Sequence, residues 1–170
     1  MTTETSSIIY RREVKEKDLK DFKEVLETSG FFYDFEVETA EDFLKMRFDD
    51  GEEESGVRYI MAEDTSVENG KLVGFICFGF DTCTLSSHLL YWMAVHNDYR
   101  GKHIGGKLIE KFEEFVISKG GKKIVLETAG RDLYKPTRDF YEKHGYREEG
   151  IVPDYYSVGD ARVTYVKDVG

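Results

Sequence analysis

The sequence predicts an α/β fold in which a mixed sheet is flanked by helices. Three observations support this fold class: short apolar runs alternate with amphipathic helical patterns, a turn signal joins two apolar runs, and a strand-helix-strand succession indicates parallel neighbours. The chain has 170 residues, of which 40% are hydrophobic, so it can bury one sizeable core. We therefore expect a single domain over residues 1–170, with a flexible terminus at residues 1–7.

The N-terminal part predicts one strand and two helices. The strand is expected at Ile8–Arg12, and apolar residues at helical spacing predict a helix over Lys17–Thr28. A second helix is expected to begin at Thr39, because a threonine hydroxyl can cap the first turn, and to carry Leu44 toward the core. The acidic run Asp49–Gly56 would then end this helix.

Three strands are expected next. The runs Val57–Glu63 and Lys71–Phe80 flank an Asn-Gly turn signal, so they should pair as an antiparallel hairpin. The third run, His88–Val95, is strongly apolar and enters a loop that is rich in glycine and basic residues.

Each remaining element has its own signal. The apolar stripe Leu108–Val116 predicts a helix that stops at two glycines, and Lys123–Thr128 is a short apolar strand. A short helix is expected within Pro136–Gly145, because proline suits a first turn and glycine closes a helix. The last two strands are expected to be Tyr146–Ile151 and Arg162–Asp168, joined by a turn-rich connection.

The segment Val95–Ile109, VHNDYRGKHIGGKLI, points to phosphate binding. A strand that feeds a helix through a glycine-rich loop leaves the first helical amides without intrahelical partners, and the helix dipole adds partial positive charge there. Although the chain carries a formal net charge of -10, four basic side chains crowd this loop: Arg100, Lys102, His103 and Lys107. The spacing matches neither a P-loop nor a dinucleotide-binding fingerprint. The alternative is a solvated basic turn with a purely structural role.

This segment resembles the pyrophosphate loop of the GNAT superfamily of acyl-CoA N-acyltransferases. The family pattern is Gln/Arg-x-x-Gly-x-Gly/Ala after a strand that ends in valine; Arg100 and Gly105 fill its first and last places, and Val95 ends the strand. His103 stands where the family usually has glycine, and histidine tolerates a left-handed backbone better than most residues. The segment Phe140–Tyr146, FYEKHGY, resembles the end of the family's fourth helix. The order of elements also matches, so the resemblance covers nearly the whole chain.

The resemblance implies the GNAT fold: a mixed, mostly antiparallel sheet of six to seven strands, about four helices, and a splayed parallel strand pair at the cofactor cleft. It implies acetyl-CoA as the acyl donor and a primary amine, on a small molecule or a peptide, as the acceptor. The amine would attack directly in a ternary complex, without a metal. Backbone groups of the splayed strand would bond the pantetheine arm, and loop amides would bond the diphosphate. The cofactor-binding residues implied are Met93, Ala94, Val95, Arg100, Gly101, Lys102, His103, Ile104, Gly105 and Gly106.

The resemblance also implies two proton-transfer residues. Tyr141 matches the family's general acid, which protonates the departing thiolate, and its alternative is a core aromatic residue. Glu127 matches a glutamate that some members use as general base; its alternatives are an ordinary strand-end carboxylate and a water chain in its place. Histidine side chains are common acid–base groups in active sites, and His96 follows the splayed strand directly, but it could be a plain loop residue. The residues Asp154–Tyr156 lie in a connection that often borders the acceptor pocket in the family.

Charge and cysteine content limit the partners. Residues 1–70 contain 20 acidic and 9 basic residues, whereas residues 71–170 contain 14 and 15. This asymmetry disfavours nucleic acid and membranes as partners and favours a cationic amine, unless the acidic residues are simply a solvated face. Cys77 and Cys83 lack metal-ligand spacing, which favours free thiols and a cytoplasmic protein without a metal site. No apolar run approaches the ~20 residues of a membrane-spanning helix.

Two other functions stay open at this point. The first is a GNAT-like module that binds or senses acyl-CoA without catalysis, since His103 departs from the family pattern. The second is an unrelated α/β protein whose basic turn binds another phosphorylated ligand. The sequence also leaves open whether the chain forms a homodimer.

Overall fold

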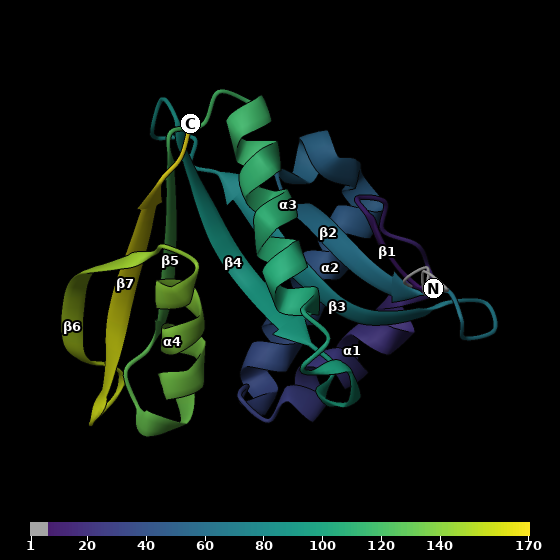
Figure 1. The fold of residues 1–170 in the computed structure, drawn as a ribbon, viewed down its shortest axis with the longest axis horizontal. Coiled ribbons are helices and arrows are strands. Elements are labelled where there is room, and N and C mark those ends of the chain that lie inside the picture. Colours follow the sequence, from purple (N-terminus) through teal and green to yellow (C-terminus); the bar gives the residue numbers. More distant parts are fainter. Residues whose placement is uncertain (1–6) are drawn as a thin grey trace, which may run out of the picture. The chain divides into compact units, whose positions relative to one another are not determined.

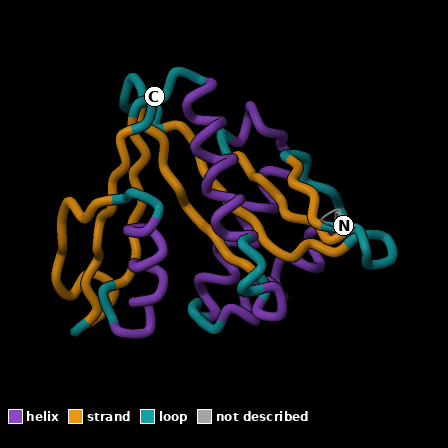
Figure 2. The backbone as a smooth tube through the Cα atoms, viewed as in Figure 1, coloured by secondary structure: helices purple, strands orange, loops and turns teal. Residues whose placement is uncertain are grey.

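The computed structural model describes residues 7–170, and the elements follow the predicted order (Figure 1). In chain order they are β1 (Ile8–Arg11), α1 (Asp18–Ser29), α2 (Asp34–Ser55), β2 (Arg58–Asp64), β3 (Lys71–Phe80), β4 (Ser87–Val95), α3 (Ile104–Ser118), β5 (Lys123–Ala129), α4 (Lys135–Lys143), β6 (Arg147–Ser157) and β7 (Asp160–Asp168). Single 3₁₀ turns cover Asn97–Tyr99 and Asp132–Tyr134, and short loops join most elements (Figure 2).

The strands are ordered β1-β2-β3-β4-β5-β7-β6. β4 and β5 run parallel, whereas β1 with β2, β5 with β7, and β6 with β7 run antiparallel. A parallel pair follows from the helix α3 that connects β4 to β5, since parallel neighbours need a crossover. The predicted mixed sheet flanked by helices is confirmed.

Contacts within the chain divide it into two units. The first comprises the chain up to Cys77 together with Trp92–Phe112, and the second comprises Phe78–Tyr91 together with Glu113–Gly170. The first contains β1, β2, α1 and α2, the second contains α4, β5, β6 and β7, and the elements β3, β4 and α3 contribute to both. The expected single domain stays a prediction. Of the terminus expected to be flexible, residues 1–6 lie outside the described part of the chain.

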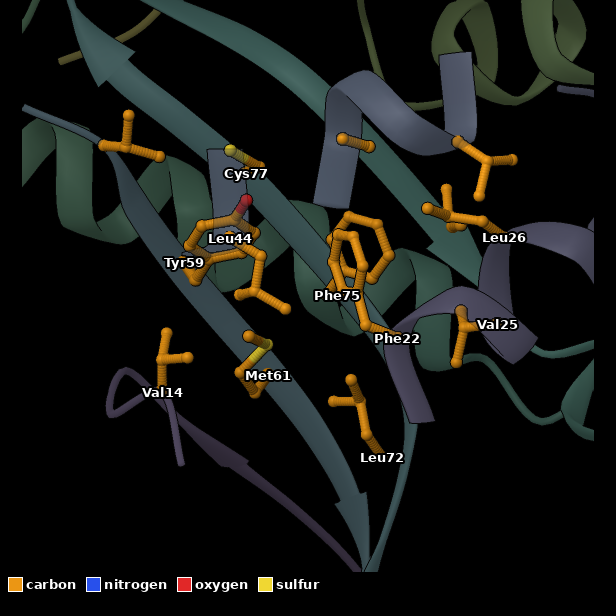
Figure 3. Packing of buried hydrophobic residues seen from close by; sticks show 14 residues of the cluster. Val14, Phe22, Val25, Leu26, Leu44, Tyr59, Met61, Leu72, Phe75 and Cys77 are labelled. Carbon is orange, nitrogen blue, oxygen red and sulfur yellow. The ribbon is translucent and has the colours of Figure 1, made fainter. Parts of the chain in front are cut away.

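The core of the first unit shows what holds α1 and α2 in place. The ring centroid of Phe22 on α1 lies 4.2 Å from that of Phe75 on β3, and the Tyr59 ring of β2 packs against both (Figure 3). Leu44 of α2 is buried in the same cluster, as its helical pattern predicts. Burying a side chain of this size stabilises a fold by roughly 1.5–3 kcal/mol. Apolar contact with β2 and β3 therefore fixes both helices.

Buried charges join β1, α1 and β2. Asp18 at the start of α1 is fully buried and accepts two hydrogen bonds from the Arg11 guanidinium, at 2.8 and 2.6 Å. Glu63 of β2 accepts from Arg11 at 2.5 Å and from Lys17 at 2.6 Å. Burial raises the pKa of Glu63, but the hydrogen bonds from Lys17 and Arg11 outweigh it and lower the pKa to about 2. Glu63 is therefore a charged partner of Arg11 and Lys17 at neutral pH.

The prediction that the second helix begins at Thr39 is wrong. α2 begins at Asp34, after Tyr33, whose N–H donates to the Glu36 carboxylate at 2.8 Å. The glutamate thus satisfies an amide at the helix start, which is one half of a capping box. Thr39 lies inside the helix, where its hydroxyl donates to the Phe35 carbonyl at 2.8 Å.

The acidic run Asp49–Gly56 ends α2, as predicted. Gly51 interrupts the helical backbone with φ of 82° and ψ of 175°, and Gly56, with φ of 67°, follows the last helical residue. Both conformations lie in regions that glycine adopts with little strain.

The last hairpin is longer than predicted. β6 runs on to Ser157, past the predicted end at Ile151. The strand continues through Pro153 because β6 is the outermost strand of the described sheet, where a proline costs no ladder hydrogen bond on its open side. Its register with β7 shifts around Asp154, which has φ of 53° and accepts a hydrogen bond from the Gly159 N–H at 2.6 Å.

Candidate functional site

The loop after β4 has the backbone that a phosphate-binding turn needs. After Val95, one 3₁₀ turn leads to Gly101, with φ of 75°, and to His103, with φ of 59°. α3 begins directly afterwards at Ile104. Histidine tolerates positive φ better than most side-chain-bearing residues, so His103 takes a left-handed conformation that glycine would adopt more freely.

The amides of residues 101–106 give this loop its chemistry. The first backbone hydrogen bond of α3 runs from the Lys107 N–H to the His103 carbonyl, at 3.0 Å. Within residues 7–170, no backbone carbonyl accepts from the N–H groups of residues 101–106. Free amides at a helix N-terminus attract anions, since their hydrogens and the helix dipole both offer positive charge. The loop can therefore bind a phosphate or a diphosphate group.

β4 extends beyond its pairing with β5. In the described part of the chain, this register covers only Ser87 to Leu90 on β4. Met93, Ala94 and Val95 lie past that point, and Ala94 is buried while its two neighbours are half-buried. A strand segment with an unpaired edge can hydrogen-bond an extended ligand through its backbone.

Gly74 of β3 lies against the candidate site and is not among the residues predicted from the sequence. A Cβ atom added to Gly74 would lie 3.2 Å from the Ala94 carbonyl oxygen and 3.3 Å from Cγ2 of Ile104. The absent side chain lets β3 approach the end of β4 and the start of α3. A glycine inside a strand pattern is the signal that could have found it, because such glycines mark close backbone approach.

Gly74→Ala should lower the free energy of unfolding by about 1–2 kcal/mol, because its crowded neighbours must shift by a few tenths of an ångström. The amide resonances of residues 101–106 should move with them. Gly150→Ala is the matched control, since a Cβ there would meet no atom within 4 Å. Urea denaturation and amide spectra measure both effects; equal responses of the two variants would contradict this role for Gly74.

The basic side chains of the loop contact protein groups. The Arg100 guanidinium donates to the Ser29 carbonyl at 2.8 Å and lies 5.3 Å from the centroid of the Phe31 ring. The Lys102 ammonium lies 4.6 Å from the centroid of the Tyr99 ring. Arg100 is thus engaged with the C-terminal end of α1, whereas Lys102 stays within its own loop.

His96 is buried, and both of its ring nitrogens have partners. Its Nε2 lies 3.0 Å from a Glu24 carboxylate oxygen, and its Nδ1 accepts from the Asp98 N–H at 3.2 Å. Because Nδ1 is an acceptor, Nε2 carries the hydrogen that is donated to Glu24. Hydrogen bonds from His96 and then Lys71 lower the pKa of Glu24. His96 therefore holds the loop to α1 rather than offering a free base.

Tyr141 of α4 lies in the core of the second unit. Its side chain is 6% exposed, and its ring centroid lies 5.7 Å from that of Tyr146 and 6.3 Å from that of Tyr165. Among the described residues, its hydroxyl has no hydrogen-bond partner. Burial raises the pKa of Tyr141, so the hydroxyl keeps its proton at neutral pH. The roles of core aromatic residue and proton donor are compatible here.

Glu127 of β5 also lies in the second unit, where it forms an ion pair. Its carboxylate lies 3.4 Å from the Arg162 guanidinium of β7, which in turn lies 4.5 Å from the centroid of the Tyr155 ring. Burial and then the negative charge of Glu127 raise the pKa of Tyr156 to about 12. The structure thus brings Tyr155 and Tyr156 close to Glu127. Arg162 was not predicted from the sequence, because the pairing of the strands in the fold is what brings it to Glu127 and Tyr155.

Neither a metal site nor a reactive buried thiol is found within residues 7–170. Among residues 7–170, no three His, Cys, Asp or Glu side chains group so that they could hold a metal ion. No helix in the same range has the length and apolar content to cross a membrane. Both cysteines are free, and burial raises the pKa of the Cys77 thiol to about 12, so it is a poor nucleophile.

The amino-acid sequence is similar to those of known acetyltransferases. The family model for the acetyltransferase (GNAT) domain matches residues 55–148. An uncharacterized N-acetyltransferase of Methanocaldococcus jannaschii is 29% identical over 100 residues, which are 58% of this chain and 61% of that protein. An acetyltransferase of Sodalis glossinidius is 34% identical over 83 residues, which are 49% of this chain and 55% of that protein. The chain thus spans little more than half the length of these relatives.

Solved structures agree on the fold. A protein assigned to the GNAT family in Desulfovibrio desulfuricans has a TM-score of 0.89 at 28% identity, covering 96% of this chain and 99% of that one. An aminoglycoside 6′-N-acetyltransferase in complex with coenzyme A has a TM-score of 0.69 at 21% identity, with coverages of 94% and 96%. The ribosomal-protein-S18-alanine N-acetyltransferase of Escherichia coli has a TM-score of 0.72 at 16% identity, with coverages of 96% and 94%. At these two lower identities, the likeness shows the fold alone.

Proposed function

Because this chain belongs to the GNAT family of acetyltransferases, we propose that it transfers an acetyl group from acetyl-CoA to a primary amine. The observation that carries the proposal is the row of free amides at residues 101–106, at the start of α3 and shortly after β4. Acetyl-CoA, when bound, supplies the thioester-activated acetyl group. The loop amides would hold its diphosphate, and the backbone of Met93–Val95 would bond the amides of its pantetheine arm.

In the proposed reaction the amine attacks the thioester carbonyl directly: the carbon–nitrogen bond forms first and leaves an oxyanion, and the carbon–sulfur bond breaks as the carbonyl re-forms. An ammonium with a pKa near 10 must first lose a proton, for which Glu127 or a water chain is the proposed base. A backbone N–H near Val95 would stabilise the oxyanion. Tyr141 would give its proton to the departing thiolate, and the second proton that the nitrogen loses would pass through water to restore the Tyr141 hydroxyl. No covalent enzyme intermediate is needed.

The acceptor is proposed to be a cationic amine, carried by a small molecule or a peptide. Three acidic residues of α2, Glu38, Glu41 and Asp42, outnumber the one basic residue, Lys45, in the lining of an open pocket of about 330 Å³ in the first unit. At the start of α2, the exposed rings of Tyr33 and Phe35 stack with centroids 5.5 Å apart. Carboxylates and aromatic faces both attract ammonium groups. These features favour a cationic acceptor over an acidic one.

A titration followed by an acceptor screen tests the proposal. Acetyl-CoA should bind in calorimetry, and CoA release should be at least about tenfold faster with cationic amines than with acidic ones of similar size. Binding of acetyl-CoA without turnover of any amine would favour the sensing module instead. Tight binding of ATP without a response to acetyl-CoA would favour a protein for another phosphorylated ligand.

Two properties of the whole protein are part of this proposal. Free thiols at Cys77 and Cys83 favour a reducing compartment, so we place the protein in the cytoplasm. Exposed apolar side chains on β6, among them Ile151 and Tyr155, offer a surface on which a homodimer could form.

A further inference from the structure

Direct contacts tie the loop after β4 to the C-terminal end of α1. They involve a buried histidine, a backbone amide and an arginine of the loop, and they all lie within the first unit. The contacts are His96 Nε2 with Glu24 Oε1 at 3.0 Å, Asn97 N–H with Thr28 Oγ1 at 3.3 Å, Arg100 Nη2 with the Ser29 carbonyl at 2.8 Å, and the Arg100 guanidinium with the Phe31 ring centroid at 5.3 Å. The loop and the helix end therefore form one connected structure.

Arg100 completes the end of α1. The last carbonyls of a helix have no intrahelical partner and carry partial negative charge, which a cation stabilises. α1 has no basic residue in its own last turn. Arg100 supplies that cation from the loop by donating to the Ser29 carbonyl, and its guanidinium also lies near the Phe31 ring.

These contacts hold the Arg100 guanidinium against α1. One of its N–H groups donates to the Ser29 carbonyl and its plane lies near the Phe31 ring, while the free amides of residues 101–106 already provide donors for a diphosphate. We propose that Arg100 is a positioning residue, which fixes the loop to α1 so that its amides keep the orientation that binds diphosphate. The proposal rests on the proposed binding of acetyl-CoA at this loop.

The coupling must work in both directions. If the end of α1 stabilises the ordered loop, the same coupling free energy applies in reverse. A ligand that stabilises the ordered loop therefore also stabilises the ordered end of α1. Acetyl-CoA should therefore slow amide exchange in the last turn of α1 as well as in the loop. In Arg100→Ala the protection should stay confined to the loop.

Hydrogen–deuterium exchange of the ligand-free protein tests the tether by itself. Arg100→Ala and Phe31→Leu should each speed exchange about fivefold, both in the loop and in the last turn of α1. Lys20→Ala is the matched control, because it removes an exposed cation of α1 that lies before the last turn and should change neither segment. Unchanged exchange, or faster exchange only in the segment that carries the substitution, would overturn the tether.

Binding of acetyl-CoA then separates positioning from direct contact. For a positioning residue, Arg100→Ala and Phe31→Leu should each raise Kd about fivefold, and the double variant should be no worse than the more affected single variant. The salt dependence of Kd should stay that of the wild type. Normal affinity in Phe31→Leu with a weaker salt dependence in Arg100→Ala would show a direct bond and overturn the proposal. If the wild type does not bind acetyl-CoA, the proposed function fails, and the ligand-free exchange still decides on the tether.

Discussion

Gly105→Asp should weaken acetyl-CoA binding about a hundredfold while the protein keeps its stability. Gly105 lies in the first turn of α3, where a carboxylate is favourable to the helix because the free amides and the dipole are positive. The same carboxylate would repel a diphosphate bound at these amides, and two like charges about 5 Å apart repel by about 3 kcal/mol at an effective dielectric constant of about 20. Calorimetry measures the affinity, and thermal unfolding measures the stability.

Two comparison variants separate charge from size. Gly105→Ala adds only a methyl group. Its affinity for acetyl-CoA should fall less than about tenfold, because the crowding of a single methyl group is the only cost. Ser118→Asp adds the same charge at an exposed position near the other end of α3, and salt screens it from the loop beyond about 10 Å. Equal losses in both Gly105 variants would indicate crowding rather than repulsion. Unchanged affinity in Gly105→Asp would place the diphosphate elsewhere.

Short sequence patterns predicted correctly those elements whose ends are marked by turn-forming residues. β3 was predicted with both of its bounds, since an Asn-Gly turn precedes Lys71 and the apolar run ends at Phe80. The start of α2 was missed because it depends on the Glu36 carboxylate bonding the Tyr33 amide, and tyrosine is not a usual cap residue. β6 was predicted too short because Pro153 is tolerated only by virtue of the strand's place at the edge, which periodicity does not reveal.

The backbone of the candidate site was accessible to sequence reasoning, whereas the side-chain partners were not. The loop pattern predicted a strand-to-helix turn and allowed a left-handed residue at His103, because both depend on neighbours in sequence. The partners of His96 and Arg100 come from α1, about seventy residues earlier in the chain. Such contacts follow from the assembled fold, so spacing within a motif cannot show that a basic side chain is already engaged.

Tyr141→Phe should lower kcat about a hundredfold and leave the free energy of unfolding unchanged. The hydroxyl of Tyr141 has no hydrogen-bond partner among the described residues, so its removal breaks no bond within the protein. Burial raises its pKa, which keeps the proton available for the departing thiolate. The KM for acetyl-CoA should stay near that of the wild type, because a general acid acts in the transition state. Steady-state kinetics and urea denaturation measure the two quantities.

Tyr165→Phe is the matched control for this prediction. The Tyr165 hydroxyl donates to the Glu142 carboxylate at 2.9 Å, so its loss should cost about 1 kcal/mol of stability while kcat stays near that of the wild type. Since the pKa of Tyr141 is raised, the wild-type kcat should not decline through loss of this proton below about pH 10, the ordinary value for tyrosine. A normal kcat in Tyr141→Phe would assign proton donation to another group. A second outcome would lead to the same conclusion: if the wild-type kcat declines below about pH 9 and Tyr141→Phe shows the same decline, the proton comes from a different acid.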